Sequence, residues 1–466
     1  MLIAVAVAAA GCGGGGAKNL PQGASVAPAS APAFMSIDTR FSSAQWKSAT
    51  RLALRFPAAR SLLDTLNTFK SAVGHEVDVV WLDFRDGGAD NVILTKPRSK
   101  KKLKAFLHSQ GDLFAQTAVG DWLAVSGDAT LLDRLKRLAK GRKLDGDKDF
   151  RDAFGKLDHG AVVRAWVRGS AVQGALDRAL ERSGAPPNLT RDVGALQSIA
   201  GWARAEKDGV RAEAAGTVSP APNPKTYAPS LASSLPKGAL LYVSFAHLDD
   251  PTKIILRLVG RSKPNFNRQL GSVQGVLGIN LRNDVYPLVR GEGALAVYPH
   301  ARIPAILFVQ KVRDEEKAKH VVGRIAAIAQ LGAKARLGST TIGGVEVQSI
   351  GIPNSRVTIY DAVFDGKVVV TNDKPIATRA IVGGARLSDD PLFRTARAKA
   401  HLPGKVVAFT YGDLRHGLPF VFDFAQRTGS RVPPAARANT KPLESALVYA
   451  TTDANRFVLS GFATIK

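Results

Sequence analysis

The sequence is poor in cysteine: Cys12 is the only one in 466 residues. A single cysteine forms no disulfide within the chain and supplies no cysteine-based metal site, so both frameworks are excluded. After residue 12 the chain also lacks an apolar run of the roughly 18–20 residues that span a bilayer. We therefore expect the part of the chain after residue 12 to fold as a soluble body.

Acidic residues are also scarce, because 39 Asp and Glu stand against 64 Lys and Arg. The net charge of +25 is spread over both halves of the chain. Such a charge suits attraction to polyanions, namely nucleic acid, acidic lipid or an anionic wall polymer. The alternative is a solvated, Arg-rich surface without a partner. Aromatic residues do not interleave with the basic clusters as base stacking requires, so no nucleic-acid partner is expected.

Motifs of known chemistry are absent as well. The sequence has no G-x-S-x-G, S-x-x-K or phosphate-binding glycine loop, and no His-x-x-x-His pair. Residues 145–149 resemble the start of a calcium loop, but Phe150 and Lys156 stand where an EF-hand needs Gly and Glu. His159 and His401 occupy matching loops without metal-ligand neighbours, which favours turn hydrogen bonds. We expect no cofactor, no metal, no catalytic residues and no enzymatic activity.

The amino terminus has the pattern of an export signal. Residues 2–10 are uniformly apolar and small residues follow, which is typical of a secretory signal peptide. Ala9, Ala10, Gly11 and Cys12 resemble the bacterial lipobox, in which the cysteine is diacylated. We predict a lipoprotein signal peptide at residues 1–12 and a membrane anchor through Cys12 on the outer face of the cytoplasmic membrane. The Gly, Ala, Ser and Pro content of residues 13–32 predicts a flexible tether.

The segment at residues 121–167 occurs twice. It begins DWLAVSGDATLLDRLK, and about 245 positions later the chain has DGKVVVTNDKPIATRA. Both copies predict a strand, an Asp, a helix, a Leu, an acidic turn, a Phe-centred helix, a loop His and a Val-rich strand. This order indicates a tandem duplication. We predict repeat 1 at residues 33–218, a Pro-rich linker at 219–236 and repeat 2 at 237–466.

Each repeat is predicted to be an α+β unit. Short strands separated by amphipathic helices predict a mixed, largely antiparallel sheet with helices packed on one face. Asp128 is placed to cap the helix that follows it. Each repeat closes with a hairpin, the first at residues 199–217. Repeat 2 contains an additional hairpin near residues 341–361, with Gly343 and Gly344 as its turn.

Several of these segments resemble one protein family. They are the lipobox at Cys12, PAFMSIDTRFSSAQWKSATRLALRFP near the start, GGVEV at residues 343–347 and SGFATIK at residues 460–466. They resemble the actinobacterial lipoproteins catalogued as domain of unknown function 3352. The resemblance implies a surface lipoprotein and supplies no catalytic residues.

Two basic clusters are the candidate polyanion-binding residues. The first opens the helix after residues 91–95, where lysines oppose the helix dipole and so indicate a role other than stability. Repeat 2 has Glu315 and Glu316 at this place, so we do not expect the cluster to be repeated. The second lies on and after the helix that begins at Asp128. The candidates are Lys96, Arg98, Lys100, Lys101, Lys102, Lys104, Arg134, Lys136, Arg137 and Lys140.

These features lead to three hypotheses. The first is a non-enzymatic, membrane-anchored lipoprotein of the cell envelope whose basic surface binds an anionic lipid, a wall polymer or a protein. The second is a carrier of an apolar or lipid ligand in a cleft between the repeats. The third and weakest is an envelope hydrolase whose site is assembled from distant loops. The oligomeric state is not indicated by the sequence.

Overall fold

The protein forms two compact units. The computed structural model describes residues 20–84, 88–109, 111, 113–182, 194–220, 224–263, 265–301, 303–353, 355 and 357–466. Unit 1 comprises residues up to 223 together with 433–443 and 452–466, and unit 2 comprises residues 224–432 and 444–451. Cys12 and the predicted signal peptide lie outside the described residues. Among the helices that are described, none is long and apolar enough to cross a membrane.

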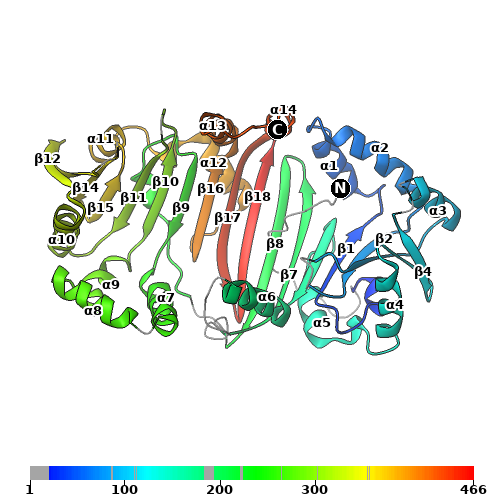
Figure 1. The fold of residues 1–466 in the computed structure, drawn as a ribbon. Coiled ribbons are helices and arrows are strands. Elements are labelled where there is room, and N and C mark those ends of the chain that lie inside the picture. The colour runs from blue at the N-terminus through cyan, green and yellow to red at the C-terminus, as the bar shows by residue number, and fades with distance from the viewer. Residues whose placement is uncertain are drawn as a thin grey trace. The chain divides into compact units, whose positions relative to one another are not determined.

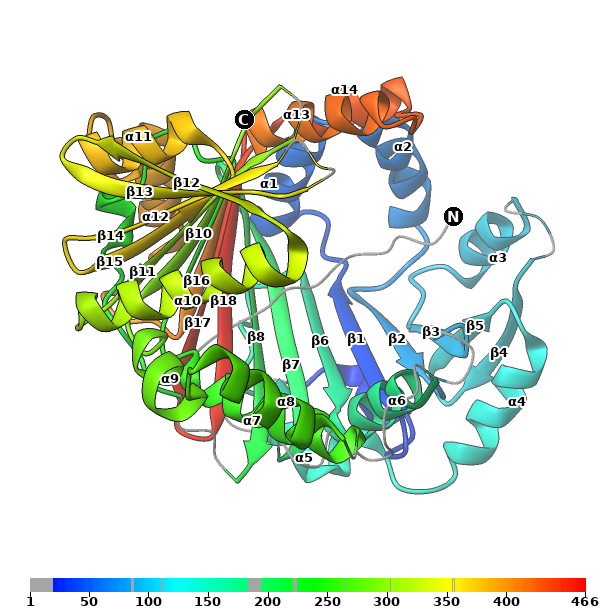
Figure 2. The same cartoon turned by 60° about the vertical axis from the view of Figure 1, so that its left-hand side comes forward.

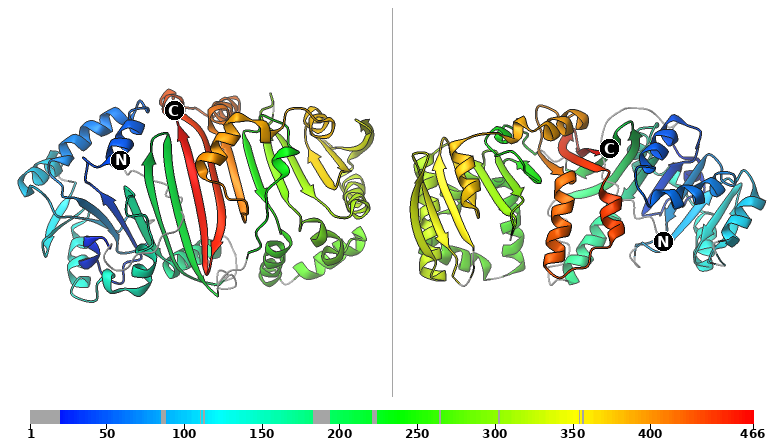
Figure 3. Two further views of the ribbon diagram at one scale, coloured as in Figure 1. Left: turned by 180° about the vertical axis from the view of Figure 1, so that it is seen from behind. Right: turned by 90° about the horizontal axis from the view of Figure 1, so that it is seen from above.

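Unit 1 is built on one antiparallel sheet (Figure 1). The strand order of unit 1 ends with the carboxyl-terminal strand of the chain, which lies beside β8 in Figures 1 and 3. In spatial order the strands are β4 (Ala115–Val119), β5 (Trp122–Ser126), β3 (Asn91–Thr95), β2 (Glu76–Trp81), β1 (Ala33–Asp38), β6 (Val163–Arg168), β7 (Ala195–Glu206), β8 (Gly209–Ser219) and β18 (Arg456–Ile465).

Helices cover both faces of the unit 1 sheet. On β2, Val80 packs into a cluster with Leu135 and Phe150, whereas Val77 points to the other face and packs with Leu103. Figure 2 shows strands β3, β4 and β5 between α3 and α4. The helices are α1 (Ala44–Ala53), α2 (Ala59–Lys70), α3 (Lys100–Ser109), α4 (Ala129–Leu138), α5 (Lys148–Phe154), α6 (Gly169–Arg182) and α14 (Pro434–Thr440). The α+β class is confirmed, but the prediction that helices pack on one face is wrong.

Seven strands of unit 2 repeat the strand order of unit 1, and a hairpin of two further strands is added at one edge. From one edge to the other its strands are β17 (Leu443–Asp453), β16 (Ala408–Asp413), β9 (Leu241–Phe245), β10 (Gly293–Tyr298), β11 (Ala305–Lys311), β15 (Lys367–Thr371), β14 (Thr358–Phe364), β13 (Val345–Gly351) and β12 (Arg336–Ile342). Strands β17 to β14 match β7, β6, β1, β2, β3, β5 and β4 of unit 1 one by one. All of these pairings are antiparallel, so the sheets are not mixed.

The additional strands form the predicted Gly-Gly hairpin. Gly343 and Gly344, between β12 and β13, have φ angles of 56° and 81°. Two successive positive φ angles are the geometry of a tight hairpin turn, which glycine adopts without steric cost. The addition comprises β12 and β13, whereas β14, which the predicted range included, is the counterpart of β4.

Helices lie on both faces of the unit 2 sheet as well. Val363 on β14 packs with Ala318 and Val321 of α10, whereas Ala362 packs with Ile381 of α11. The helices are α7 (Asp249–Ser262), α8 (Phe266–Leu277), α9 (Tyr286–Leu288), α10 (Glu315–Ala333), α11 (Lys374–Val382), α12 (Pro391–Ala400) and α13 (Leu414–Arg427). Figure 2 shows β12, β13 and β14 between α10 and α11.

The matching strands carry matching cores and caps. In unit 1, Phe150 of α5 meets Phe34 and Trp166 edge-on, with centroid distances of 5.5 and 5.3 Å. In unit 2 the counterparts are Phe393, Tyr242 and Tyr411, with distances of 5.8 and 5.0 Å. The predicted cap at Asp128 is confirmed, since its carboxylate accepts a hydrogen bond from the Thr130 amide at 2.8 Å. Asp373 caps α11 in the same way.

The segment predicted as a tether is folded from residue 20 onward. Ala24, Ala27 and Ala31 are fully or almost fully buried in the unit 1 core, and residues 22–25 form a short 3-10 helix. The prediction is wrong for residues 20–32, because the small side chains of this segment allow it to pack closely against the core. The same pattern, P-x-x-A-S-x-x-P, recurs at residues 229–236, within the predicted linker.

These two short segments make the same contacts in their own units. The Leu144 amide donates to the Ala27 carbonyl at 2.9 Å, and the Leu387 amide donates to the Leu235 carbonyl at 2.9 Å. Each repeated pattern therefore belongs to the fold that follows it, and the correspondence between the units begins at residue 21.

Candidate functional site

The basic cluster after β3 has a counterpart after β11. In the sheet register Thr95 pairs with Val77, and Gln310 pairs with Gly293 at the matching place of unit 2. The following residues are therefore equivalent: Lys96 with Lys311, and Arg98 with Arg313. The prediction that the cluster is not repeated is wrong for these two charges, because the K-x-R pattern lies before the helix and not within it.

In unit 1 this pattern lines a cavity of about 550 Å³. Four of the lining residues are Lys or Arg and two are carboxylates. The lining comes from the short 3-10 segment, the ends of β1, β2, β5 and β6 and the loops beside them. It consists of Leu20, Gln22, Ser36, Asp38, Arg40, Gly74, His75, Glu76, Lys96, Arg98, Trp122, His159, Ala161 and Arg164.

Two arginines of this cavity are each paired with a histidine. Arg98 Nη2 lies 3.3 Å from His75 Nδ1, and Arg164 Nη1 lies 3.3 Å from His159 Nδ1. A guanidinium only donates, so Nδ1 is the acceptor and the ring proton is on Nε2 in each pair. Burial and the Arg164 charge lower the pKa of His159, which favours this neutral ring.

A third arginine is engaged by a carboxylate. Arg40 binds both oxygens of Asp38, with distances of 2.7 to 3.0 Å. Lys96 lies 5.4 Å above the Trp122 ring, and its Nζ is 4.0 Å from Asp121. The other carboxylate of the lining is Glu76.

Glu76 holds the short segment, and a buried acid lies beside it. Glu76 Oε1 accepts a hydrogen bond from the Gly23 amide at 3.1 Å. Asp78 is fully buried, and within the described residues neither of its carboxyl oxygens has a partner at hydrogen-bonding geometry. Burial raises the pKa of Asp78 well above its ordinary value, and the Glu76 charge raises it further. The protonated, neutral form of Asp78 is therefore favoured.

The matching cavity of unit 2 measures about 820 Å³. Seven Lys and Arg residues and five carboxylates line it. The cations are Lys225, Lys253, Arg290, Lys311, Arg313, Lys317 and Lys367, and the carboxylates are Asp249, Asp250, Glu292, Asp314 and Asp365. Both cavities thus have two more cationic than carboxylate side chains in their lining.

Glu292 has the same structural task as Glu76. Its carboxylate accepts from the Ser230 and Leu231 amides at 2.7 and 2.8 Å. It also pairs with Lys311 at 3.0 Å, although its own side chain is only 5% exposed. Asp249 similarly neutralises Lys253 and Arg290, both at 3.0 Å. Lys225, Lys317 and Lys367 also pair, with Asp250, Asp284 and Asp365, so six of the seven cations form ion pairs within the fold.

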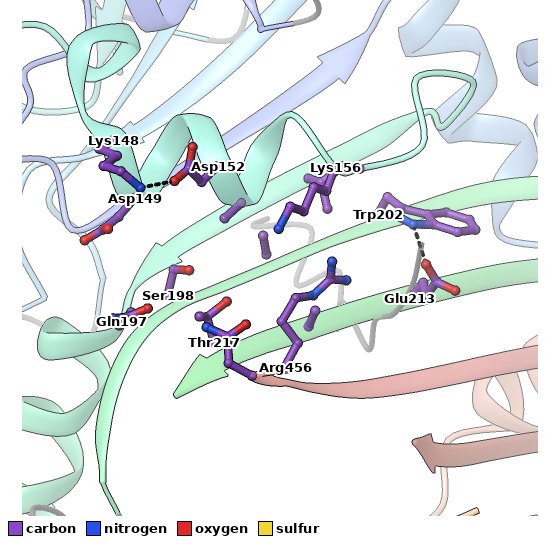
Figure 4. A pocket seen from close by; sticks show the side chains of 15 residues that line it. Lys148, Asp149, Asp152, Lys156, Gln197, Ser198, Trp202, Glu213, Thr217 and Arg456 are labelled. Atoms are coloured by element: carbon purple, nitrogen blue, oxygen red, sulfur yellow. Dashed lines mark hydrogen bonds and ion pairs between the residues drawn. The ribbon is translucent and has the colours of Figure 1, made fainter. Parts of the chain in front are cut away.

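A third cavity, of about 220 Å³, lies in unit 1 between α5 and strands β7, β8 and β18 (Figure 4). Lys156 and Arg456 point into it from opposite sides, as Figure 4 shows. At one end the Trp202 indole donates to Glu213 at 3.0 Å. Burial raises the pKa of Glu213 to about 8. In the sequence, the only indication of this environment is that Glu213 stands between alanines in the β8 strand.

The remaining predicted residues do not converge on one surface. Four of them, Lys100, Lys101, Lys102 and Lys104, are exposed on α3. The cations of α4 lie across the sheet from α3, on the opposite face. Among them Arg134 is paired with Asp83 and Asp90 at 3.2 Å, whereas Lys136, Arg137 and Lys140 are exposed. Cys12 lies outside the described residues.

Sequence reasoning missed His75 and Arg164 in the lining of the unit 1 cavity and the buried Asp78 beside Glu76. They come from β2 and β6, which are distant from Lys96 in the chain, so only the strand register brings them together. His401, the expected counterpart of His159 in the second repeat, is the C-cap residue of α12 and has a φ of 56°. Within the described residues, no group of three or more His, Cys, Asp or Glu could hold a metal ion.

Comparison with known proteins gives a family but no activity. The family described as Protein of unknown function (DUF3352) matches residues 89–455. No curated protein sequence matches the chain. Solved structures similar to parts of it include crystal forms IV and I of TP0453, at 12% and 10% identity. They have TM-scores of 0.26 each and cover 50% and 51% of this chain and 81% and 78% of their own.

Proposed function

The chain belongs to the DUF3352 family of proteins of unknown function, and from its cavities we propose that it is a non-enzymatic binding protein of the cell envelope. In this proposal Cys12 carries a diacyl anchor, and the folded units face outward from the cytoplasmic membrane. The ligand is an anionic component of the envelope. Two lipid chains give far more stable anchoring than one, so the anchor would keep the cavities close to that component.

One observation carries the proposal. The K-x-R pattern occupies the same strand end in both units, and in each unit it lines a cavity in which cations outnumber carboxylates by two. Low-dielectric walls around a site with excess charge strengthen its attraction for ligands of opposite charge. The overall charge of +25 would add a long-range attraction that falls with salt.

The test is sedimentation of the protein with purified envelope across a salt series. The chain carries Cys12→Ser, so that no lipid contributes to binding. Binding should fall steeply from low to physiological salt. The double variant Arg98→Gln, Arg313→Gln should bind more weakly than the parent protein.

A second double variant, Lys100→Gln and Lys102→Gln, removes the same charge from the exposed face of α3. A smaller loss with this variant supports the cavities as the binding sites. A larger loss of binding with this variant would show that the exposed face of α3, and not the cavities, is the binding site. Absence of sedimentation at every salt concentration refutes the electrostatic proposal.

A further inference from the structure

The cavity between α5 and strands β7, β8 and β18 shares no lining residue with the two K-x-R cavities. All of its lining residues belong to unit 1. Its volume of about 220 Å³ is below the roughly 300–1,000 Å³ of sites for drug-sized ligands, so it admits only a small molecule. Such a molecule would have α5 on one side and the strands on the other.

Two cationic side chains point into this cavity from opposite sides (Figure 4). Lys156 follows α5, and Arg456 begins β18. Within the described residues, Lys156 Nζ has no hydrogen-bond or ion-pair partner. The Arg456 side chain is 11% exposed, and Asp453, at 3.7 Å, is its one charged partner among those residues. Two like charges directed into one small space repel each other, so an anion between them is favoured.

The acids of the lining do not cancel these two charges. Asp152 is bound to Lys148 at 2.5 Å, although the charge of Lys156 also acts on it. Figure 4 shows the Asp149 carboxylate directed away from the middle of the cavity. Burial raises the pKa of Glu213 to about 8, so this carboxyl is mostly protonated at neutral pH. Three cations and two ionised carboxylates then line the cavity, which leaves one positive charge in excess.

Strand β7 is distorted where it passes the cavity. Gln197 is an extra residue between Leu196 and Ser198, a β-bulge in the pairing with β8. Successive residues of a regular strand face opposite sides, but here Gln197 and Ser198 both line the cavity. Ser198 is only 3% exposed, and its hydroxyl has no hydrogen-bond partner in the part of the chain that the structure describes. Bulges that redirect a side chain in this way are common beside functional sites.

We propose that this cavity binds a small hydroxylated carboxylate, namely a sugar acid, between Lys156 and Arg456. A guanidinium binds a carboxylate through two parallel hydrogen bonds, and one carboxylate matches the single excess charge of the lining. A phosphate monoester carries up to about two negative charges, more than the lining offsets. The hydroxyl groups of the ligand would meet the polar side chains of the lining, which are Gln197, Ser198, Thr217 and Asn455.

The experiment is calorimetric titration of the full chain carrying Cys12→Ser with galacturonate, and with galactose as its uncharged counterpart. Galacturonate should bind and galactose should not. Lys156→Gln should weaken galacturonate binding about 10- to 100-fold, because a hydrogen bond to a charged group contributes about that much. Lys156 is exposed, so this substitution leaves the core intact. The matched control is Lys207→Gln, which removes one charge from the exposed turn between β7 and β8.

The pH dependence of binding gives a second measurement. Galacturonate binding should weaken as the pH rises through about 8, because Glu213 ionises and cancels the excess charge. The charges acting on Glu213 are those of Arg456 and Arg211, which favour its ionised form, and that of Asp158, which opposes it. Glu213→Gln should still bind galacturonate at neutral pH and should lose this pH dependence, because glutamine does not ionise.

A parallel titration distinguishes a free sugar acid from one at the end of a polymer. If trigalacturonate binds as tightly as the monomer, the cavity accepts the terminal sugar of a polymer. If only the monomer binds, the ligand is a free sugar acid.

Three results overturn the sugar-acid site: no titration with galacturonate, equal binding of galactose, or equal weakening by Lys156→Gln and Lys207→Gln. This inference goes beyond the proposed function, which rests on the K-x-R cavities. If sedimentation with envelope persists and still depends on Arg98 and Arg313, the proposed function stands even where the sugar-acid site fails. If galacturonate binds but envelope does not sediment the protein, the sugar-acid site stands and the proposed function fails.

Discussion

The two units place the same glutamate at the same strand end but surround it differently. In unit 1 the Gly23 amide donates to Glu76, and in unit 2 the Leu231 amide donates to Glu292. Where unit 1 has Gly23 and buried Asp78, the corresponding residues of unit 2 are Leu231 and Ala294, both fully buried and apolar.

The hydrogen bond from the backbone amide to the glutamate is common to both units and therefore serves the fold. The buried acid Asp78 is found in unit 1 only. A shared bond between an amide and a glutamate positions the short segment against the sheet in both units. A large residue faces a small one in unit 2, whereas in unit 1 a glycine faces a carboxyl group. Burying an unpartnered acid costs stability, and such a cost is typical of binding sites.

The largest expected effect comes from giving unit 1 the leucine of unit 2. A Cβ on Gly23 would lie 2.0 Å from Oδ2 of Asp78, so Gly23→Leu must displace a buried side chain. We expect it to lower the free energy of unfolding by about 3 kcal/mol, at the upper end of overpacking. The tryptophans report unit 1 selectively, because the five in the chain are Trp46, Trp81, Trp122, Trp166 and Trp202. Urea unfolding followed by their fluorescence measures this change.

The double variant Gly23→Leu, Asp78→Ala tests the explanation. It recreates the apolar pair of unit 2, so it should recover at least half of the loss. Residues in contact couple in this way, whereas independent residues give additive effects. If the losses in unfolding free energy from Gly23→Leu and Asp78→Ala were additive, the alanine would not make room for the leucine. The comparison with unit 2 would then not explain the packing at these two positions.

The second comparison concerns the equivalent lysines. Lys311 pairs with Glu292, whose side chain is 5% exposed, whereas Lys96 lies 4.0 Å from Asp121, which is 90% exposed. Removing the partner of a buried charge is costly, but Lys311 is itself 44% exposed and solvent reduces the effect. Lys311→Gln should therefore cost about 1–2 kcal/mol, and Lys96→Gln less than about 0.5 kcal/mol.

The two units can be observed separately in this experiment. Lys311→Gln should shift the unfolding transition seen by circular dichroism without shifting the tryptophan transition of unit 1. Lys96→Gln should leave both transitions close to those of the parent protein. Equal costs for the two lysines would show that Glu292 does not depend on its ion pair.

The sequence predicted the elements better than their environment. The α+β class, the hairpin at Gly343 and Gly344 and the cap at Asp128 depend on local patterns, and all three are confirmed. The coverage of both sheet faces was missed, although Val77 and Val80 on opposite faces of β2 are both apolar. The folded segment at Ala24 was missed because its composition resembles that of a linker.

The cavity required information that no local pattern contains. Lys96 and Arg98 were identified from charge density, which is visible in the chain. Their neighbours His75 and Arg164 are scattered through the sequence and converge only because β2, β1 and β6 pair in one register. The recurrence of K-x-R became recognisable only when the strand registers of the units were aligned.

The last comparison concerns one acid in each unit, the half-buried Glu213 and the buried Asp361. Burial raises the pKa of Glu213 to about 8 from 4.5 and that of Asp361 to about 6 from 3.8. In each case the folded protein binds the proton more tightly than the unfolded chain. Stability is therefore full below the unfolded pKa and falls as pH rises toward the folded pKa. The windows are about 4.5 to 8 for Glu213 and 3.8 to 6 for Asp361.

Melting temperatures measured between about pH 5 and 8.5 separate the two acids. The parent protein should lose a few degrees as the pH rises. Glu213→Gln should flatten the decline up to about pH 8 in the tryptophan transition, because glutamine does not ionise. Asp361→Asn should change the slope only below about pH 6, and only in the transition of unit 2. If Glu213→Gln left the slope between pH 6.5 and 8 unchanged, the carboxyl beside Trp202 would already be ionised at neutral pH.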